Sequence, residues 1–306
     1  MNQNPETISI PENHRCGSVA IIGRPNVGKS TLLNCLIGQK ISITAKRPQT
    51  TRHRILGIRT RPDAQIVYVD TPGLHQAGKR AMSRYLNRTA SSVLEEGIDV
   101  VLWLITAMQW TDEDNDVLER LASCKVPVFL LVNKIDRVHD KSTLLPYLQK
   151  ISAKKEFLHV VPISALQGEN VKKLEDLIIP NLPEGAPHFP EDQVTDRSLR
   201  FLAAELVREK LIRHLGEELP YALTCEVERF IEKEELTQVG VVIWVERQGQ
   251  KAIVIGKEGR VLKQVGREAR EDMERIFENK VYLETWVRIR SGWSDDEQAL
   301  AKFGYA

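Results

Sequence analysis

The chain has 306 residues, which favours about two domains, and its composition of 42% hydrophobic and 28% charged residues allows buried cores. The net charge of +1 excludes a protein that is basic throughout, so any nucleic-acid-binding surface has to be local. Four scattered cysteines without a C-x-x-C pair, a polar first segment and the lack of an apolar run of roughly 18 residues argue against a disulfide framework, a zinc site, a signal peptide or a membrane span.

Short apolar runs alternate with longer mixed stretches up to about Ile179. The runs, rich in Val, Ile and Leu, are typical of strands buried on both faces of a sheet: "VAIIG", "QIVYVD", "VVLWLI", "PVFLLVNK" and "VVPIS". The stretches between them predict helices, so the pattern predicts an α/β domain with a mostly parallel sheet. Two extended runs around a Pro-Asp turn in "GIRTRPDAQIVYVD" predict one antiparallel hairpin at the edge.

A phosphate-binding loop follows the first apolar run. The stretch "GRPNVGKST", residues 23–31, fits G-x-x-x-x-G-K-[ST] between a predicted strand and a predicted helix. Lys29 can reach the β- and γ-phosphates, and the Ser30 hydroxyl can ligate Mg²⁺. This context favours a nucleoside triphosphate site over a chance glycine-rich turn, with contacts from Gly23, Arg24, Pro25, Asn26, Val27, Gly28, Lys29, Ser30 and Thr31.

The segment "VYVDTPG" ends the next predicted central strand. Asp70 can bind Mg²⁺ through water, and the backbone N–H of Gly73 can reach a γ-phosphate because glycine allows close approach. Alone the segment would be an ordinary turn, but after a phosphate loop it predicts nucleotide contacts. These contacts are expected from Asp70, Thr71, Pro72, Gly73 and Leu74.

The segment "LLVNKID" indicates which base is bound. Asp136 can accept both the N1–H and the 2-amino hydrogens of guanine, which adenine cannot supply, and such a site rejects the wrong base by roughly 10⁴. Asn133 can bond the loop and the O6/N7 edge, while the Lys134 stem can lie against the ring. In "ISA", Ser164 and Ala165 can offer a backbone N–H toward O6. The sequence therefore predicts GTP.

A proline-rich segment, "PNLPEGAPHFPEDQ", precedes a change in element order. Proline fixes φ and lacks an N–H, so this is a linker or a stiff strap. The later pattern is α-β-β-α-β, or α-β-β-α-α-β if a short helix starts at the glycine loop described below. We expect a GTPase domain at 15–182, a linker at 183–196 and a second domain at 197–306.

The second domain contains a G-x-x-G at 256–259 in "VIGKEGRVLK", expected between a strand end and a helix. With this element order it predicts an α+β, type II KH domain, whose G-x-x-G clamps about four nucleotides of single-stranded RNA. Residues 251–270 carry six basic and two acidic side chains, although Glu258 lies inside the clamp. RNA contacts are expected from Ile255, Gly256, Lys257, Gly259, Arg260 and Lys263.

The competing interpretation is a solvated helix face with mixed charge. The protein would then be a GTP-dependent membrane or protein-interaction switch that uses the amphipathic helix at 197–215. A steep salt dependence of RNA binding separates the two classes.

Together these motifs resemble the translation-factor-like class of P-loop GTPases, and "GRPNVGKST", "KRPQTTRHRILGI" and "DTPGLH" resemble the Era family in particular, from about Ser18 to the C-terminus. The resemblance implies that "PQTTR" is the first switch. Its Mg²⁺-binding hydroxyl is then Thr51, with Thr50 the alternative. Lys29, Thr51 and Gly73 are expected to serve the reaction, and Ser30, Thr51 and Asp70 to hold Mg²⁺.

Leu74 stands where small signalling GTPases use a glutamine to orient the attacking water. Leucine cannot do this, so we expect Leu74 to pack, His75 to face solvent and intrinsic hydrolysis to be slow. In relatives with the same loop, the resemblance implies that Asn26 helps to hold K⁺ in place of an arginine finger; whether K⁺ acts here stays open.

The resemblance also implies partners beyond GTP and GDP: 16S ribosomal RNA near its 3′ end and the 30S subunit, whose maturation the protein assists. We expect a cytoplasmic monomer, and leave open whether a fraction binds peripherally to the inner face of the cell membrane.

Overall fold

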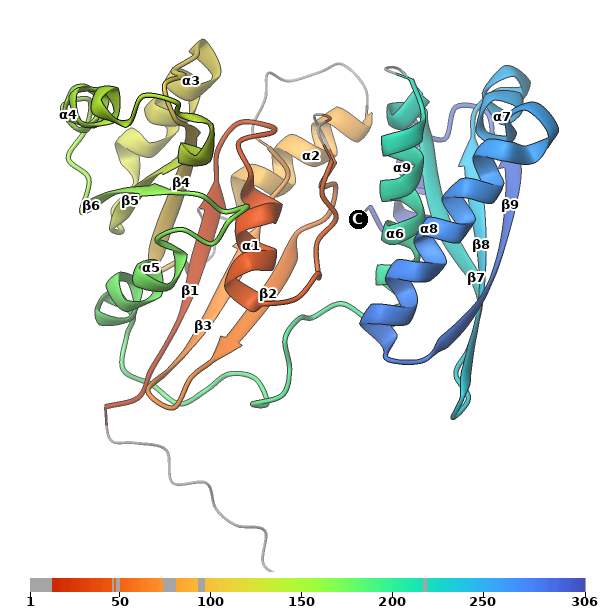
Figure 1. The fold of residues 1–306 in the computed structure, drawn as a ribbon, viewed down its shortest axis with the longest axis horizontal. Coiled ribbons are helices and arrows are strands. Elements are labelled where there is room, and N and C mark those ends of the chain that lie inside the picture. Colours follow the sequence, from red (N-terminus) through yellow and green to blue (C-terminus); the bar gives the residue numbers. More distant parts are fainter. Residues whose placement is uncertain are drawn as a thin grey trace, which may run out of the picture.

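The computed structural model describes residues 13–45, 47, 50–73, 81–92, 97–216 and 219–305. Within these residues the chain forms two units side by side, each with its own sheet (Figure 1). Among the expected site residues, Leu74 lies outside the described residues, as do His75 and the first two residues of "PQTTR". None of the described helices is long and apolar enough to span a bilayer.

The first unit is built on a sheet whose described strands follow the order β2-β3-β1-β4-β5-β6. All neighbours are parallel except the β2–β3 pair at the edge, which confirms the expected hairpin. The strands are β1 (Arg15–Ile22), β2 (Ile55–Thr60), β3 (Ala64–Asp70), β4 (Val100–Thr106), β5 (Val128–Asn133) and β6 (His159–Ile163).

Helices cover both faces of this sheet. Leu32 and Leu174 belong to the core under α1 and α5, and Val117 and Ile151 belong to the core under α3 and α4. Since both faces are buried, the strands are almost wholly apolar. The helices are α1 (Lys29–Ile37), α2 (Ala81–Ser92), α3 (Asp112–Arg120), α4 (Leu144–Ser152) and α5 (Val171–Ile178). This α/β arrangement brings the carboxyl ends of β1, β3 and β5 to one edge, where ligands bind in such folds.

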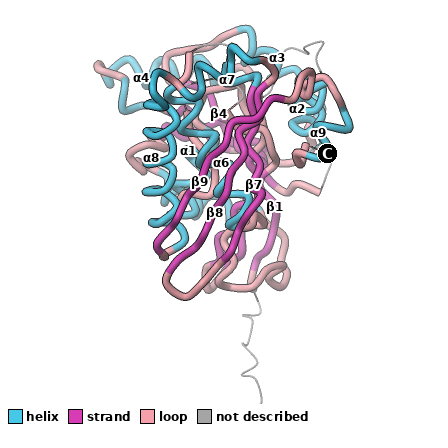
Figure 2. Tube along the Cα trace, turned by 90° about the vertical axis from the view of Figure 1, so that its right-hand side faces the viewer, coloured by secondary structure: helices cyan, strands magenta, loops and turns pink. Residues whose placement is uncertain are grey.

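The second unit is the predicted α+β domain, with described strands in the order β7-β8-β9. β8 is antiparallel to β7 and parallel to β9. Helices α6 and α8 cover one face, and the other face is open in Figure 2. The strands are β7 (Leu223–Ile231), β8 (Leu236–Val245) and β9 (Lys280–Ile289), and the helices are α6 (Leu199–His214), α7 (Gln248–Ile255), α8 (Arg260–Phe277) and α9 (Glu297–Lys302).

The longer of the two expected element orders is confirmed, with one correction. The residues before the G-x-x-G are helix α7, not the end of a strand, and this helix ends at the glycine loop instead of starting there. Two contacts explain the helix: the side-chain oxygen of Gln250 accepts the backbone N–H groups of Glu246 and Arg247, and Val254 is buried in the core. A parallel β8–β9 pair also needs a crossover connection, which helices supply.

The proline-rich segment is an ordered strap along the first unit. Its residues Glu184 and Thr195 form β-bridges to Arg15 and Gly57. The side-chain oxygen of Gln65 accepts the backbone N–H groups of residues 188 and 189 at 2.8 and 2.9 Å. The strap therefore positions α6 beside the first unit. The domain boundaries at 15–182, 183–196 and 197–306 stay predictions.

Candidate functional site

The phosphate loop has a backbone that only glycine adopts without strain. Gly23 and Gly28 have φ of 144° and 109°. A Cβ on Gly28 would lie 2.4 Å from Asn133 Nδ2, and one on Gly23 would lie 2.5 Å from the Leu104 carbonyl oxygen. The loop therefore packs tightly against β4 and β5, and its end opens into α1, whose N-terminal N–H groups favour an anion.

Lys29 is held inside this loop. Its buried ammonium donates to the carbonyl oxygens of Gly23 and Arg24 at 3.0 and 3.1 Å. Burial lowers the pKa of Lys29 to about 8, with Asp70 opposing the shift, so most of this side chain is charged at neutral pH. A cation is thus fixed where the phosphates of a nucleotide would lie.

Three hydroxyls and a carboxylate meet beside Lys29. Ser30 Oγ and Ser42 Oγ donate to Asp70 Oδ2 at 2.7 and 3.1 Å. Thr51 Oγ1 lies 2.7 Å from Ser30 Oγ, whose own hydrogen goes to Asp70. Asp70 Oδ1 is buried without a hydrogen-bond partner among the described residues. Because hydroxyl and carboxylate oxygens suit Mg²⁺, the residues present fit this ion.

The two candidate threonines of the first switch differ in direction. Thr50 Oγ1 donates to the carbonyl oxygen of Arg47 at 2.7 Å. Thr51 Oγ1 meets Ser30 instead. The geometry therefore favours Thr51 as the metal ligand.

The predicted base-reading residues form one cluster. Asn133 Nδ2 donates to Val27 O at 2.7 Å, and its Oδ1 accepts the backbone N–H of Ala165 at 3.0 Å. Asp136 Oδ1 accepts from Ser164 Oγ at 2.6 Å. Since the Ala165 N–H is already donated to Asn133, a contact to guanine O6 would have to share or replace that bond.

Two other predicted contacts lie at the loop. Lys134 Nζ donates to the carbonyl oxygen of Asn26 at 2.5 Å. A Cβ on Gly73 would lie 2.9 Å from Pro25, so the "DTPG" backbone comes close to the phosphate loop. Thr71 Oγ1, in contrast, donates to Ile21 O and supports the strand.

A cavity of about 870 Å³ joins these motifs. Besides six first-unit residues, the lining that the sequence did not indicate includes Ile212 and Arg213 of α6 in the second unit. They lie far along the chain, and no local pattern marks them. The first-unit lining is formed by Pro25, Asn26, Gly28, Lys29, Ser30, Thr31, Ile43, Thr44, Ala45, Arg47, Thr50, Thr51, Gly73, Lys134, Arg137 and Leu166.

The G-x-x-G turn joins α7 to α8. Gly256 and Gly259 have φ of 73° and 74°, and a Cβ on Gly259 would meet no atom within 4 Å, so this side of the turn is open. Glu258 pairs with Arg260 at 3.0 Å, and Lys257 is exposed. Lys257 is thus accessible in the glycine turn, while the carboxylate of Glu258 is paired with Arg260.

A groove of about 380 Å³ continues from this turn along α8 and β9. Three basic side chains line it, Lys263, Arg267 and Arg270, together with Leu262 and Leu283. Lys263 was among the predicted RNA contacts; the apolar pair was not, because nothing in the local sequence shows that β9 reaches α8.

The C-terminal tail packs inside the protein. Trp293 is fully buried, its ring centroid lies 5.5 Å from that of Phe303, and both belong to a cluster with Tyr85 and Leu86 of α2. The tail thus packs against α2 of the first unit.

This fold and these sites define a class: a P-loop GTPase joined to a KH domain. A family model described as 50S ribosome-binding GTPase matches residues 18–134, and one described as KH domain matches residues 218–294. The chain is 58% identical to GTPase Era of Stenotrophomonas maltophilia (strain R551-3), over 95% of this chain and 98% of that protein. It is 53% identical to GTPase Era of Pseudomonas aeruginosa (strain LESB58), over 97% of each.

Solved structures agree. An Era point variant from Aquifex aeolicus bound to GDP and AlF₄⁻ superposes with a TM-score of 0.91 at 39% identity, covering 95% of this chain and 99% of that one. Era in complex with MgGDPNP and nucleotides 1506–1542 of 16S ribosomal RNA gives the same TM-score and identity, covering 96% and 99%. The chain belongs to the Era family, and it is a GTPase.

Proposed function

We propose that this protein is a GTP-operated switch that binds 16S ribosomal RNA near its 3′ end through its KH domain and assists maturation of the 30S subunit. The observation that carries the proposal is the groove along α8 and β9 beside the open Gly259 turn, in a chain that superposes on an Era protein solved with a 16S ribosomal RNA segment.

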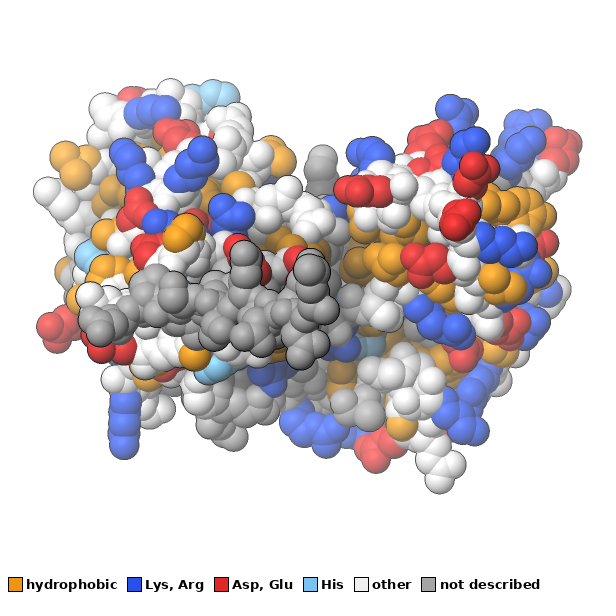
Figure 3. Space-filling view, turned by 90° about the horizontal axis from the view of Figure 1, so that it is seen from below, with side chains coloured by type: hydrophobic (Ala, Val, Ile, Leu, Met, Phe, Trp, Pro, Cys, Tyr) orange, Lys and Arg blue, Asp and Glu red, His pale blue; other side chains and the backbone are white. Residues whose placement is uncertain are grey.

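The groove suits single-stranded RNA in both of its components. Lys263, Arg267 and Arg270 supply cations for phosphates, and Leu262 and Leu283 supply an apolar floor for bases. Figure 3 shows basic and acidic side chains intermixed over both units on the face seen there. That face is therefore not uniformly basic, which agrees with a local RNA site in a chain of net charge +1.

In the nucleotide site, Ser30 Oγ, Thr51 Oγ1 and Asp70 would hold Mg²⁺, which neutralises charge on the β- and γ-phosphates. Lys29 places a buried ammonium at the same phosphates, and the close approach of Gly73 to the loop suits a backbone contact with the γ-phosphate. These residues position GTP and stabilise negative charge during hydrolysis.

Asn26 is proposed to help hold K⁺ beside the phosphates. Asn26 lines the same cavity as Lys29, and its backbone has φ of 63°, a conformation that asparagine tolerates. A cation there would supply the positive charge that an arginine finger supplies in other GTPases.

A cytoplasmic monomer completes the proposal. The four cysteines are free in the described part of the chain, which suits a reducing compartment. Peripheral binding of a fraction to the inner membrane face remains a separate expectation.

The RNA proposal is tested by titrating a single-stranded RNA with the 16S 3′-terminal sequence against the full chain at several salt concentrations. The double variant Lys263→Gln, Arg267→Gln should bind more weakly, with the slope of log K against log salt reduced by about 0.7 per lost phosphate contact. Lys233→Gln, an exposed lysine on the β7–β8 turn outside the groove, is the matched control. An unchanged slope in the double variant, or no RNA binding by the native chain, favours the protein- or membrane-interaction class.

A further inference from the structure

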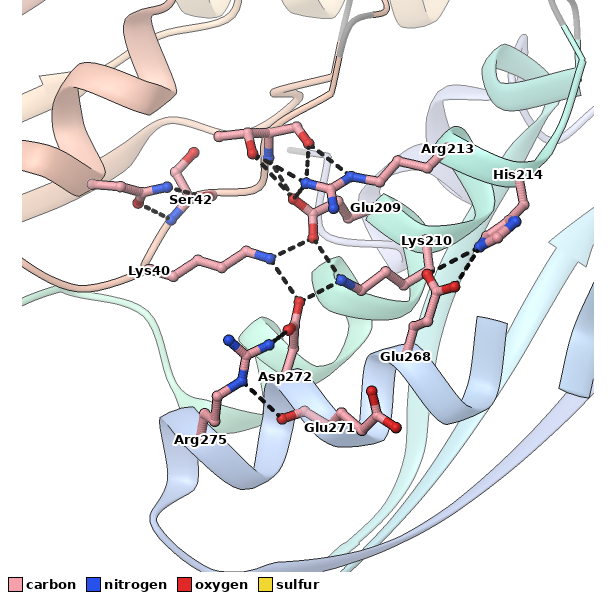
Figure 4. A network of polar contacts seen from close by, with 12 residues as sticks. Lys40, Ser42, Glu209, Lys210, Arg213, His214, Glu268, Glu271, Asp272 and Arg275 are labelled. Carbon is pink, nitrogen blue, oxygen red and sulfur yellow. Dashed lines mark hydrogen bonds and ion pairs between the residues drawn. The ribbon is translucent and has the colours of Figure 1, made fainter. Parts of the chain in front are cut away.

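Helix α6 buries charge against the GTPase domain. We use "switch segment" for residues 40–54, of which the structure describes 40–45, 47 and 50–54. Glu209 Oε1 accepts the backbone N–H of Thr44 at 2.8 Å, and its Oε2 accepts from Lys40 Nζ at 2.5 Å. Lys40 and Lys210 also both donate to Asp272 of α8 (Figure 4). Helices α6 and α8 of the KH domain thus bind the beginning of the switch segment through hydrogen bonds and ion pairs.

A second buried pair on α6 reaches the end of the switch segment. Arg208 is fully buried and donates from Nε and Nη2 to the two carboxylate oxygens of Glu205 at 2.7 and 2.6 Å. Burial would raise the pKa of Glu205, but the adjacent Arg208 guanidinium outweighs it and lowers that pKa, so the pair stays ionised. A buried ion pair of this kind is costly unless its remaining hydrogen bonds are made.

One of those bonds goes to the backbone beside the metal site. Arg208 Nη2 donates to the carbonyl oxygen of Thr50 at 2.5 Å, across the domain interface. On the other side of Thr51, Arg52 Nη1 donates to Leu223 O at the start of β7. Thr51 therefore stands between two residues that contact the KH domain, Thr50 through its carbonyl oxygen and Arg52 through its side chain, and its hydroxyl lies 2.7 Å from Ser30 Oγ.

We infer that Arg208 is a positioning residue for the GTPase reaction: it holds the peptide of Thr50 so that the Thr51 hydroxyl points at Mg²⁺. The inference rests on the metal role of Thr51 proposed above. Through this contact the KH domain would favour binding of GTP with Mg²⁺ over binding of GDP, because the threonine hydroxyl serves the metal that accompanies the γ-phosphate.

The test measures the affinities of the full-length chain for a non-hydrolysable GTP analogue and for GDP, each across a Mg²⁺ titration. In Arg208→Gln the affinity for the analogue should fall about tenfold, the size of one hydrogen bond from a charged donor, and its half-saturating Mg²⁺ concentration should rise. GDP affinity should stay within about twofold. A purely structural role would weaken both nucleotides together and leave the Mg²⁺ midpoint unchanged.

Two further variants protect this test. Arg208→Gln leaves the Glu205 carboxylate buried without its partner, so the double variant Arg208→Met, Glu205→Leu removes both charges at similar volume and should show the same selective loss. Arg288→Gln breaks an exposed guanidinium–carboxylate pair with Glu228, away from the GTPase domain, and should behave as the native chain.

Combining the Arg208 variants with Thr51→Ala tests whether Arg208 acts through the Thr51 hydroxyl. Thr51→Ala should lose the Mg²⁺-dependent preference for the analogue, and adding Arg208→Gln should change nothing more. A native analogue-to-GDP ratio in both Arg208 variants overturns the inference, and so does an equally large Arg208 effect in the Thr51→Ala background. Native Mg²⁺ dependence in Thr51→Ala alone would instead refute the metal role of Thr51, and the inference with it.

Discussion

Lys29 shows how much of the nucleotide site rests on single residues. Two backbone carbonyls hold its ammonium, and burial lowers its pKa to about 8. Nearby anionic phosphates would raise the pKa of Lys29 again, so its ammonium would be fully charged with GTP bound. GTP would thereby relieve the unfavourable burial of this ammonium in the free protein.

Lys29→Ala should therefore abolish GTP binding or hydrolysis, with an affinity loss on the order of 100-fold or more. The measurement is calorimetric titration with GTP and GDP plus single-turnover hydrolysis. Lys172→Ala, an exposed lysine on α5, should leave both unchanged. Near-normal affinity and turnover in a folded Lys29→Ala variant would contradict the assignment.

Asn26 carries the potassium proposal. Exchanging K⁺ for Na⁺ should slow hydrolysis several-fold in the native chain, because Na⁺ does not fit a site shaped for the larger ion. In Asn26→Ala the two salts should give equal rates. Equal rates already in the native chain would remove K⁺ from the account.

The residues named from the sequence converge in the fold because their contacts follow from local geometry. A loop after a strand and a turn at a neighbouring strand end must meet at the same sheet edge, as Ser30 and Asp70 do. Arg208, Arg213 and Ile212 escaped prediction because they reach the site from another domain, through a contact that no spacing encodes.

At the scale of elements, α6 is the amphipathic helix that the sequence predicts at 197–215, and it packs under the KH sheet. Its apolar side does pack there, through Leu206 and Leu211. Its polar side is buried too, against the switch segment. From its charge alone, this side would be expected to face solvent. Helix α7 escaped prediction for another reason: the apolar run at 253–255 suits a strand or a helix, and tertiary packing of Val254 decides.

The switch segment also contains a buried histidine near its end. His53 stacks on Tyr305 of the tail, with ring centroids 4.6 Å apart, and meets Phe201 of the second unit edge-on at 5.1 Å. Burial lowers its pKa from 6.5 to about 4, Glu205 opposes the shift, and three nearby guanidinium groups reinforce it: Arg208, Arg197 and Arg52.

This predicts an acid-sensitive interface. The unfolded chain takes up a proton near pH 6.5 and the folded chain only near pH 4, so the His53 contribution is full above pH 6.5 and is lost as pH falls toward 4. It is at most about 3 kcal/mol, at about 1.4 kcal/mol per unit. Urea unfolding at pH 7.5 and 5 should show the loss, and His53→Phe should reduce it. Exposed His139→Phe is the control; an identical pH dependence in His53→Phe would contradict the prediction.

At the scale of the whole molecule, one helix contacts the switch segment and also lines the RNA groove. α8 carries Asp272, which bonds Lys40 of the switch segment, and also Lys263 and Arg267, which line the RNA groove. In this arrangement Lys263 and Arg267 are exposed. We therefore predict that a nucleotide which favours this arrangement of the two units also favours RNA binding, through its differential affinity for two arrangements.

The direct test of this switch is the dissociation constant of one single-stranded RNA, with the 16S 3′-terminal sequence, measured with the chain bound to a GTP analogue and to GDP. The account predicts tighter binding in the analogue state by roughly 5- to 150-fold, and an equal tightening of the analogue by RNA. Gly259→Asp should weaken RNA in both states and leave GTP affinity unchanged. Identical RNA dissociation constants in the two states would contradict it, and would mean that the GTPase and KH domains are tethered but uncoupled.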